Sequence, residues 1–282
     1  MQSLQYLDVA GDIRATCPQA GSVIFWWLGQ SSFVLRSAET TMYIDPFLSY
    51  TSERLIPPPF AAEDAPPADI VLCTHEHLDH LDAATLRTMA HNCPHTRFVV
   101  PAPIVDQLAK LEIAPECILG VQPGEEVDLG GCRCMPVPAL HGLNCPPAVY
   151  DFGFEISNGL YRYLGYVIEM SNGTRLYHSG DTLVFDGLVE TVRTLHPDVV
   201  LLPINGRSYF REQQALVGNI DEREAADLAA AVGADVVIPM HYDMFAANLG
   251  RPGAFVDYVR AQHPELACYL PAHGRHFTYT KQ

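Results

Sequence analysis

Short hydrophobic runs, broken by glycine, proline and polar residues, follow one another along this 282-residue chain. Residues 23–28, 33–35 and 41–44 form three such runs joined by short turns, a spacing typical of an antiparallel meander of strands. From residue 70 onward, strand-like runs alternate with helix-like stretches, as in sheets with parallel strands. The pattern therefore predicts an α/β fold that opens with an antiparallel meander.

The later elements are predicted from the same pattern. The expected helices cover residues 82–89, 104–111, 186–194, 221–232 and 252–263. The expected strands cover residues 70–73, 97–100, 121–129, 132–137, 164–170, 174–177, 199–203, 236–241 and 266–270. Asp221 and Glu224 predict a capping box at the start of one helix, and Asn172-Gly173 predicts a type I′ turn between two strands.

The composition predicts a folded domain that does not bind nucleic acid or anionic membranes. Hydrophobic residues make up 48% of the chain and charged residues 18%, which favours a globular protein over a disordered one. The length suits one large domain, so we expect residues 1–282 to form a single domain. The formal charge of −16 repels nucleic acid and anionic membranes, and we expect neither as a partner.

The cysteines and the start of the chain indicate a cellular compartment. The eight cysteines are scattered and form no CxxC pair, which favours reduced thiols. Cys132 and Cys134 face one side of an expected strand, and we interpret them as packing residues. The chain shows no basic, apolar leader and no run of 18 apolar residues. We therefore expect a soluble, cytoplasmic protein.

Histidine and aspartate residues follow four of the expected strands. The candidate metal ligands are His75, His77, Asp79 and His80 in one HxHxDH motif, then His141, Asp181 and His241. Parallel strands gather their ends at one edge of a sheet, so these side chains are expected to converge. Imidazole and carboxylate groups suit zinc, manganese or iron. Seven ligands exceed what one tetrahedral ion needs and suit two ions about 3.5–4 Å apart. A polar loop that is merely rich in histidine is the less favoured interpretation.

Asp45 follows another expected strand and precedes Pro46. Its carboxylate either supports a metal ligand from behind or only forms the turn before the proline, and the sequence leaves both interpretations open.

The chain resembles the metallo-β-lactamase superfamily over essentially its whole length. It contains, in the same order, the HxHxDH motif, the later histidine, the aspartate in a Gly-Asp pair and the last histidine. The resemblance implies an α/β fold of four layers, an αβ/βα sandwich in which two mixed β-sheets are flanked by helices. It also implies two metal ions and a bridging carboxylate. The implied ligands are His75, His77 and His141 for one ion, Asp79, His80 and His241 for the other, and Asp181 between them.

Within the superfamily, residues 27–33, 43–47, 178–182, 203–207 and 239–243 are similar to segments of the ascorbate-6-phosphate lactonase group. The similarity implies a hydrolase that opens a phosphorylated sugar lactone. Members of that group are associated with manganese, so manganese or zinc is expected, and iron also suits the ligands.

The expected chemistry is attack of a metal-bound hydroxide on a carbonyl or phosphoryl centre. Asp79 is the candidate catalytic residue, which orients the nucleophile and passes a proton to the leaving group. Asn205, Arg207 and Tyr209 lie in a polar loop and are the candidate substrate-binding residues, with Arg162 and Arg211 as further candidate phosphate contacts. An ordinary solvated loop, with arginines that contact only water, is the alternative interpretation. The expected partners are a small anionic, phosphorylated substrate and further copies of the chain in a homo-oligomer.

Two other functions fit the same ligands. One is a phosphodiesterase or phospholipase-D-like hydrolase, and the other is a non-catalytic metal-binding module. The proline-rich segment 56–67 is interpreted as a lid or an oligomer contact, and segment 144–163 as a loop that covers the site.

Overall fold

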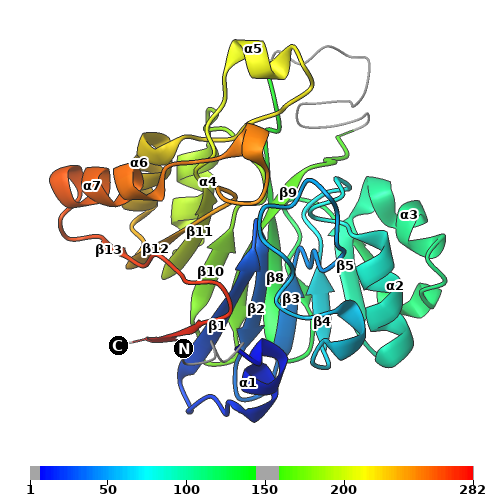
Figure 1. The fold of residues 1–282 in the computed structure, drawn as a ribbon. Helices are drawn as coiled ribbons and strands as arrows, with labels where there is room; N and C mark the ends of the chain where they lie inside the picture. Colours follow the sequence, from blue (N-terminus) through cyan, green and yellow to red (C-terminus); the bar gives the residue numbers. More distant parts are fainter. Residues whose placement is uncertain (1–6, 144–158, 282) are drawn as a thin grey trace, which may run out of the picture.

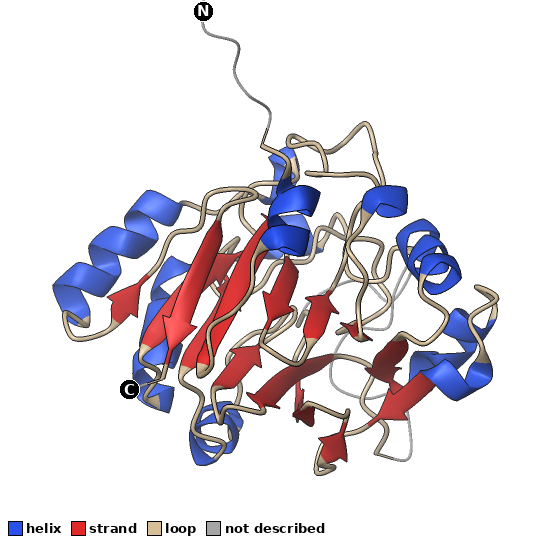
Figure 2. Ribbon diagram, turned by 90° about the horizontal axis from the view of Figure 1, so that it is seen from below, coloured by secondary structure: helices blue, strands red, loops and turns tan. Residues whose placement is uncertain are grey.

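Two β-sheets lie face to face between layers of helices in the computed structural model, which describes residues 7–143 and 159–281 (Figure 1). Figure 2 shows the strands in the middle of the molecule and helices on both outer sides. The first sheet has the order β14-β1-β2-β3-β4-β5-β6, and the second has the order β13-β12-β11-β10-β9-β8-β7. This is the four-layer sandwich of two mixed sheets that the resemblance implied.

The strands and helices have the following bounds. The first sheet contains β14 (His276–Thr280), β1 (Ser22–Gly29), β2 (Ser32–Arg36), β3 (Thr41–Ile44), β4 (Ile70–Leu72), β5 (Arg97–Pro101) and β6 (Ile118–Val121). The second contains β13 (Ala267–Cys268), β12 (Val236–Met240), β11 (Val199–Pro203), β10 (Arg175–His178), β9 (Leu164–Met170), β8 (Cys132–Pro138) and β7 (Val127–Asp128). The helices are α1 (Val9–Ala15), α2 (Ala83–Asn92), α3 (Val105–Ala109), α4 (Leu188–Thr194), α5 (Tyr209–Glu212), α6 (Glu222–Val232) and α7 (Pro252–Gln262).

Strand β1 shows why the chain forms layers. All eight of its residues are buried, and successive side chains point to opposite faces of the sheet. Phe25 and Trp27 join the hydrophobic cluster shared with the second sheet. Ile24 and Trp26 join a separate cluster that lies under α1, α2 and α3. A strand that is apolar on both faces therefore needs a partner layer on each side, which the second sheet and the helices supply.

Each sheet combines antiparallel and parallel pairing. β1, β2 and β3 form the expected antiparallel meander, and β3 to β6 run parallel. In the second sheet β7 to β10 pair antiparallel, and β10 to β13 run parallel. The parallel strands end at one side of the molecule, where the polar loops that carry the candidate ligands begin.

Several sequence-based expectations hold locally. The predicted capping box is present, with Asp221 and Glu224 bonding each other's backbone N–H groups at the start of α6. Strands β9 and β10 form the predicted hairpin. Cys132 and Cys134 are buried in the core, and the seven cysteines within the described ranges are free thiols.

Other expectations were wrong. The single strand predicted over residues 121–129 is two short strands in different sheets, β6 and β7, because a turn at Gln122 to Glu125 carries the chain from one sheet to the other. The hairpin turn is not type I′, because Gly173, with φ 78°, is left-handed there and Asn172 is not. Helix α3 is shorter than predicted, since residues 102–104 form a 3-10 turn before it.

Three elements were missed. Helix α1 and the short helix α5 lie in segments without a clear period. Strand β14 extends the first sheet by pairing with β1, and its alternation of exposed and half-buried residues is typical of an edge strand.

The structure describes all of one of the two predicted loop segments, 56–67, and only part of the other, 144–163. Segment 56–67 contains a 3-10 turn, Ala62–Asp64, that contacts α2, and Phe60 and Ala65 pack on the cluster under that helix. Residues 144–158 of the other segment lie outside the described residues. Within the described ranges, no helix has the length and hydrophobicity to cross a bilayer.

Gly165 of β9 is predicted to be essential for stability, because a Cβ added there would lie 2.8 Å from the Ser179 carbonyl oxygen and 2.9 Å from that of His178. Gly165→Ala should lower the free energy of unfolding by about 1–3 kcal/mol. Urea titration measures this change. The control is Gly253→Ala in α7, where an added Cβ meets no atom within 4 Å and alanine favours the helix by up to about 1 kcal/mol. Equal stability of the two variants would contradict the close approach of β9 to residues 178–179.

Candidate metal centre

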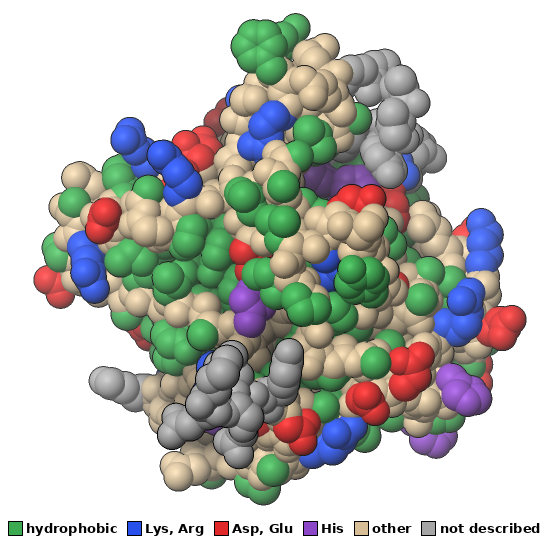
Figure 3. Space-filling model, in the orientation of Figure 1, with side chains coloured by type: hydrophobic (Ala, Val, Ile, Leu, Met, Phe, Trp, Pro, Cys, Tyr) green, Lys and Arg blue, Asp and Glu red, His purple; other side chains and the backbone are tan. Residues whose placement is uncertain are grey.

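The structure brings all seven candidate ligands together at one end of the strands. His75 to His80 follow β4, His141 follows β8, Asp181 follows β10 and His241 follows β12. Their donor atoms fall into three overlapping groups whose members lie within 4.8 Å of one another: His75, His77 and His141; Asp79, His80 and His241; and His75, His80 and Asp181. Figure 3 shows histidine and acidic side chains side by side in a recess below α5.

The first group consists of three imidazoles. His77 Nδ1 lies 3.0 Å from His75 Nε2 and 3.1 Å from His141 Nε2. Burial is the main cause that lowers the pKa of His77 to about 4 and that of His141 to about 3, and it holds the pKa of His75 well below its usual value. All three rings are therefore neutral at neutral pH. One proton on His77 Nδ1 can bond only one of its two neighbours, whereas a cation between the rings can bind all three nitrogens.

The second group combines Asp79, His80 and His241. His241 Nε2 lies 3.5 Å from Asp79 Oδ2, and His80 Nε2 lies 3.7 Å from the same oxygen. Burial alone would lower the pKa of His241, but Asp181 and Asp79 outweigh it and raise that pKa to about 9. Burial would likewise raise the pKa of Asp79, but His80 and His241 hold it below its usual value. This carboxylate is therefore ionised at neutral pH.

Asp181 lies between the two groups. Its Oδ1 is 3.4 Å from His80 Nε2, and its Oδ2 is 3.2 Å from His241 Nε2 and 3.7 Å from His141 Nε2. Asp181 therefore contacts histidines of both groups: His80 and His241 of the second and His141 of the first.

These distances fit a divalent metal ion. Donor atoms about 2.1 Å from a tetrahedral ion lie about 3.4 Å from one another, which is close to the 3.2–3.7 Å separations around Asp181 and Asp79. Most of these separations are too long for good hydrogen bonds. The buried nitrogen and oxygen donors thus have the chemistry and the spacing of a metal site.

Asp45 supports this site from behind. Its carboxylate accepts hydrogen bonds from the Thr74 N–H (2.7 Å) and hydroxyl (2.8 Å), and its Oδ2 lies 2.6 Å from His80 Nδ1. The side chain is fully buried, and its backbone is left-handed, with φ 47°. Because Nδ1 of His80 donates to Asp45, Nε2 is the nitrogen that faces Asp181 and that could bind a metal ion after losing its proton. Of the two interpretations left open by the sequence, the structure therefore supports the first.

Gln30 is a further supporting residue that the sequence analysis missed. Its side-chain Nε2 donates to Asp79 Oδ2 at 2.7 Å, and its backbone carbonyl oxygen accepts from the backbone N–H of His241 at 3.0 Å. Its backbone is left-handed, with φ 53°, in the turn between β1 and β2. A polar residue in a tight turn beside the first strand is a weak sequence signal, and the contact with Asp79 is visible only in three dimensions.

A cavity of about 250 Å³ opens beside these groups. It is lined by the candidate ligands His77, Asp79, His141, Asp181 and His241, and by Leu78, Ala215, Leu216, Val217, Phe245, Ala247 and Asn248. Apart from the ligands its wall is thus mostly apolar, and Asp79 borders the cavity.

The candidate substrate-binding residues do not line this cavity. Asn205 is buried behind it and donates to Asn248 Oδ1 at 2.8 Å, Arg207 lies 3.5 Å from Glu212, and the Tyr209 side chain is 57% exposed. The structure also pairs Arg162 with Glu76, and Arg211 with Asn248. The arginines singled out in the sequence are thus engaged by the protein itself.

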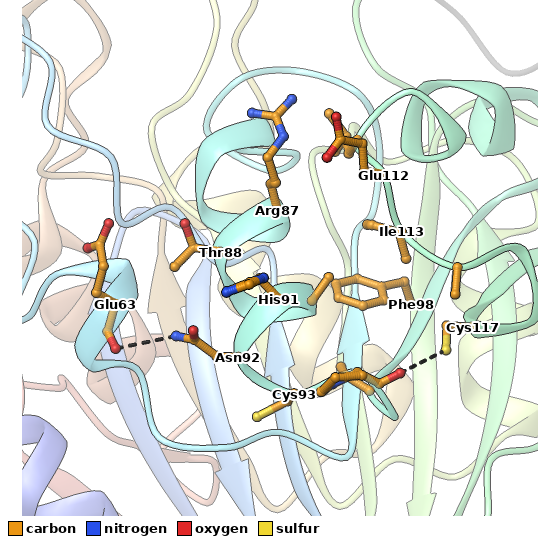
Figure 4. A pocket seen from close by; sticks show the side chains of 15 residues that line it. Glu63, Arg87, Thr88, His91, Asn92, Cys93, Phe98, Glu112, Ile113 and Cys117 are labelled. Carbon is orange, nitrogen blue, oxygen red and sulfur yellow. Dashed lines mark hydrogen bonds between the residues drawn. The ribbon is translucent and has the colours of Figure 1, made fainter.

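Another cavity is larger, at about 500 Å³, but it lies between α2 and residues 111–117 and contains none of the candidate ligands (Figure 4). Arg87 and Glu112 flank it, and Phe98 and Ile113 supply apolar surface. Volume would favour this cavity over the one beside the candidate ligands, whereas the ligand chemistry selects the smaller one.

Comparisons with known proteins agree with this geometry. Residues 40–242 match the family model described as a beta-lactamase superfamily domain. A UPF0173 metal-dependent hydrolase from Methanoculleus marisnigri is 32% identical over 231 residues, which cover 78% of this chain and 81% of the relative.

Solved structures show the same fold. A metallo hydrolase from Ignicoccus hospitalis has a TM-score of 0.69 at 22% identity, covering 93% of this chain and all of that one. A metallo-beta-lactamase fold protein from Bacillus subtilis has a TM-score of 0.65 at 13% identity, covering 92% of this chain and all of that one. With the family match and the grouped histidines and aspartates, the chain belongs to the metallo-β-lactamase superfamily and is a metal-dependent hydrolase related to the UPF0173 proteins.

Proposed function

We propose that this protein hydrolyses a small carboxylic ester or lactone, and that a phosphorylated sugar lactone is the first substrate to test. The supporting observation is that Asp79, which is ionised and belongs to the cluster of candidate ligands, borders a cavity of about 250 Å³. This volume lies just below the usual range of ligand pockets, so it suits a small substrate.

The apolar part of the wall favours a carbonyl substrate. Leu78, Leu216, Val217 and Phe245 surround the space next to the ligands. Among the described residues that line the cavity, none is lysine or arginine. A phosphate group therefore finds no cationic side chain on this wall, and the ester or lactone group is the better supported part of the proposal.

The ligands would be shared by two ions, manganese or zinc, with His75, His77 and His141 on one side and Asp79, His80 and His241 on the other. A bound divalent ion lowers the pKa of a water molecule and polarises a carbonyl oxygen. Asp79 orients the attacking water and then carries its proton to the leaving oxygen, since it is ionised and faces the cavity. Gln30 holds Asp79 in this orientation through its 2.7 Å hydrogen bond.

Replacing a ligand tests the assignment of the centre. His77→Ala is expected to lose bound metal and hydrolytic activity and to keep its fold, because His77 lies at the cavity wall and is only partly buried. Metal analysis, activity and circular dichroism of the purified variant measure the three properties. The control is His91→Ala, an exposed histidine on α2. Full metal content in His77→Ala would contradict the assignment.

Asp45→Asn tests the support behind His80. The amide keeps the shape of the side chain but loses the charge that orients the imidazole, so metal affinity should fall about 10- to 100-fold. Competition with a chelator measures this affinity. Asp69→Asn is the matched control, because Asp69 accepts a hydrogen bond from the Thr41 N–H at 2.8 Å but contacts no candidate ligand. Equal affinities of the two variants would show that Asp45 has no role in metal binding.

The reaction itself is tested with metal-free protein reloaded with manganese or zinc. Ascorbate 6-phosphate, an unphosphorylated γ-lactone and bis(p-nitrophenyl) phosphate are compared by proton release. Opening of either lactone supports the proposal, and a preference for the unphosphorylated one agrees with the apolar wall. Turnover of the phosphodiester alone would favour the phosphodiesterase alternative, and inactivity on both lactones with metal bound would overturn the proposed function.

A further inference from the structure

Asn248 is distinctive in the cavity wall. Apart from the candidate ligands, the described residues that line the cavity are Leu78, Ala215, Leu216, Val217, Phe245, Ala247 and Asn248. Asn248 is the one polar side chain in this set. It lies at the end of a 3-10 turn, Ala246–Asn248, shortly after the ligand-bearing end of β12.

Two donors determine which way its amide points. Asn205 Nδ2 donates to Asn248 Oδ1 at 2.8 Å, and Arg211 Nη2 donates to the same oxygen. A guanidinium has no acceptor atom, so the atom that faces Arg211 must be the oxygen and not the nitrogen. The orientation of the Asn248 amide is thus fixed by the chemistry of its neighbours.

The two donors are themselves held in place. Asn205 is buried, with 4% of its surface exposed. Arg211 Nη1 donates to the carbonyl oxygens of Asn205 and Gly206, each at 3.3 Å. These contacts tie the loop after β11, helix α5 and the turn after β12 to one another.

The Asn248 nitrogen is much less engaged than its oxygen. Its Nδ2 lies 3.5 Å from the Val217 carbonyl oxygen, which is at the limit of a hydrogen bond. An amide nitrogen carries two N–H groups, and this one contact can use at most one of them. An N–H donor is therefore available to a molecule in the cavity beside the metal ligands.

We propose that Asn248 donates a hydrogen bond from Nδ2 to an acceptor oxygen of the substrate, and that Arg211 and Asn205 are positioning residues that fix its amide. The inference rests on the proposed function and refines its substrate class. An uncharged donor in an apolar wall suits a neutral ester or lactone oxygen better than a phosphate. Asn248 thus takes the substrate-binding role that the sequence suggested for Asn205, Arg207 and Tyr209.

The critical variant is Asn248→Asp. A carboxylate still accepts from Arg211 and Asn205, but it cannot donate to the substrate. We expect kcat/KM for the γ-lactone to fall about 10- to 100-fold, with metal content and unfolding midpoint unchanged. Asn92→Asp, the same change at an exposed position at the end of α2, should retain wild-type kinetics.

Asn248→Ala and the positioning residues separate binding from structure. Asn248→Ala, which introduces no charge, should lose activity to a similar extent as Asn248→Asp. Arg211→Leu should also lower kcat/KM, and Arg211→Lys, which keeps a donor, should restore part of it. Wild-type kcat/KM in both metal-loaded Asn248 variants would overturn the proposal.

A direct readout distinguishes this inference from the proposed function. In the zinc-loaded wild-type protein, the Asn248 side-chain amide is followed by NMR while cyclopentanone, an unhydrolysable carbonyl analogue of a γ-lactone, is added. A shift of the Asn248 resonances without a shift of those of Asn92 supports the contact even if no lactone is turned over. Absence of a shift up to the solubility limit of the probe would overturn it.

Discussion

The contact of the Asp45 carboxylate with His80 and Thr74 is the interaction on which the centre depends. It joins the end of β3 to the loop after β4, and it is fully buried. The contact directs one imidazole nitrogen of His80 outward to the cluster and fixes the start of the HxHxDH loop through the Thr74 N–H. The backbone of Asp45 is left-handed, a conformation that aspartate adopts more readily than most residues.

Electrostatics explains why so many polar groups can be buried together here. The three imidazoles of the first group are neutral, and burial keeps them so. Around Asp181, carboxylates and imidazoles of opposite charge compensate one another. Uncompensated burial of such groups would be costly, so each charged group in this cluster depends on its neighbours of opposite charge. The arrangement needs no further element of structure, because all the groups follow strand ends that the two sheets already place side by side.

The sequence predicted the fold class and the convergence of the ligand candidates, since both depend on patterns that are local. A continuous apolar run marks a strand that is buried on both faces, such as β1. Histidines directly after such strands are expected at a sheet edge. It did not predict that residues 118–128 cross from one sheet to the other, because periodicity does not show which sheet a strand joins. It also missed β14, whose residues alternate between exposed and half-buried.

The wall of the cavity was harder to predict than the ligand positions, for a physical reason. Arginines in a polar loop are natural candidates for anion contacts. In the structure, however, Arg207 pairs with Glu212, and Arg211 donates to Asn248. The residues that line the cavity, such as Val217 and Asn248, come from turns without a motif, and only tertiary contacts place them there. Ligand positions follow from strand ends, whereas cavity walls follow from how separate loops pack.

The most direct test of the central claim, that these seven side chains form a metal centre, is anomalous diffraction from crystals of the manganese- or zinc-loaded protein. A centre with two ions gives anomalous density on both sides of Asp181, with one peak among His75, His77 and His141 and one among Asp79, His80 and His241. Strong density elsewhere, with none among these residues, would contradict it.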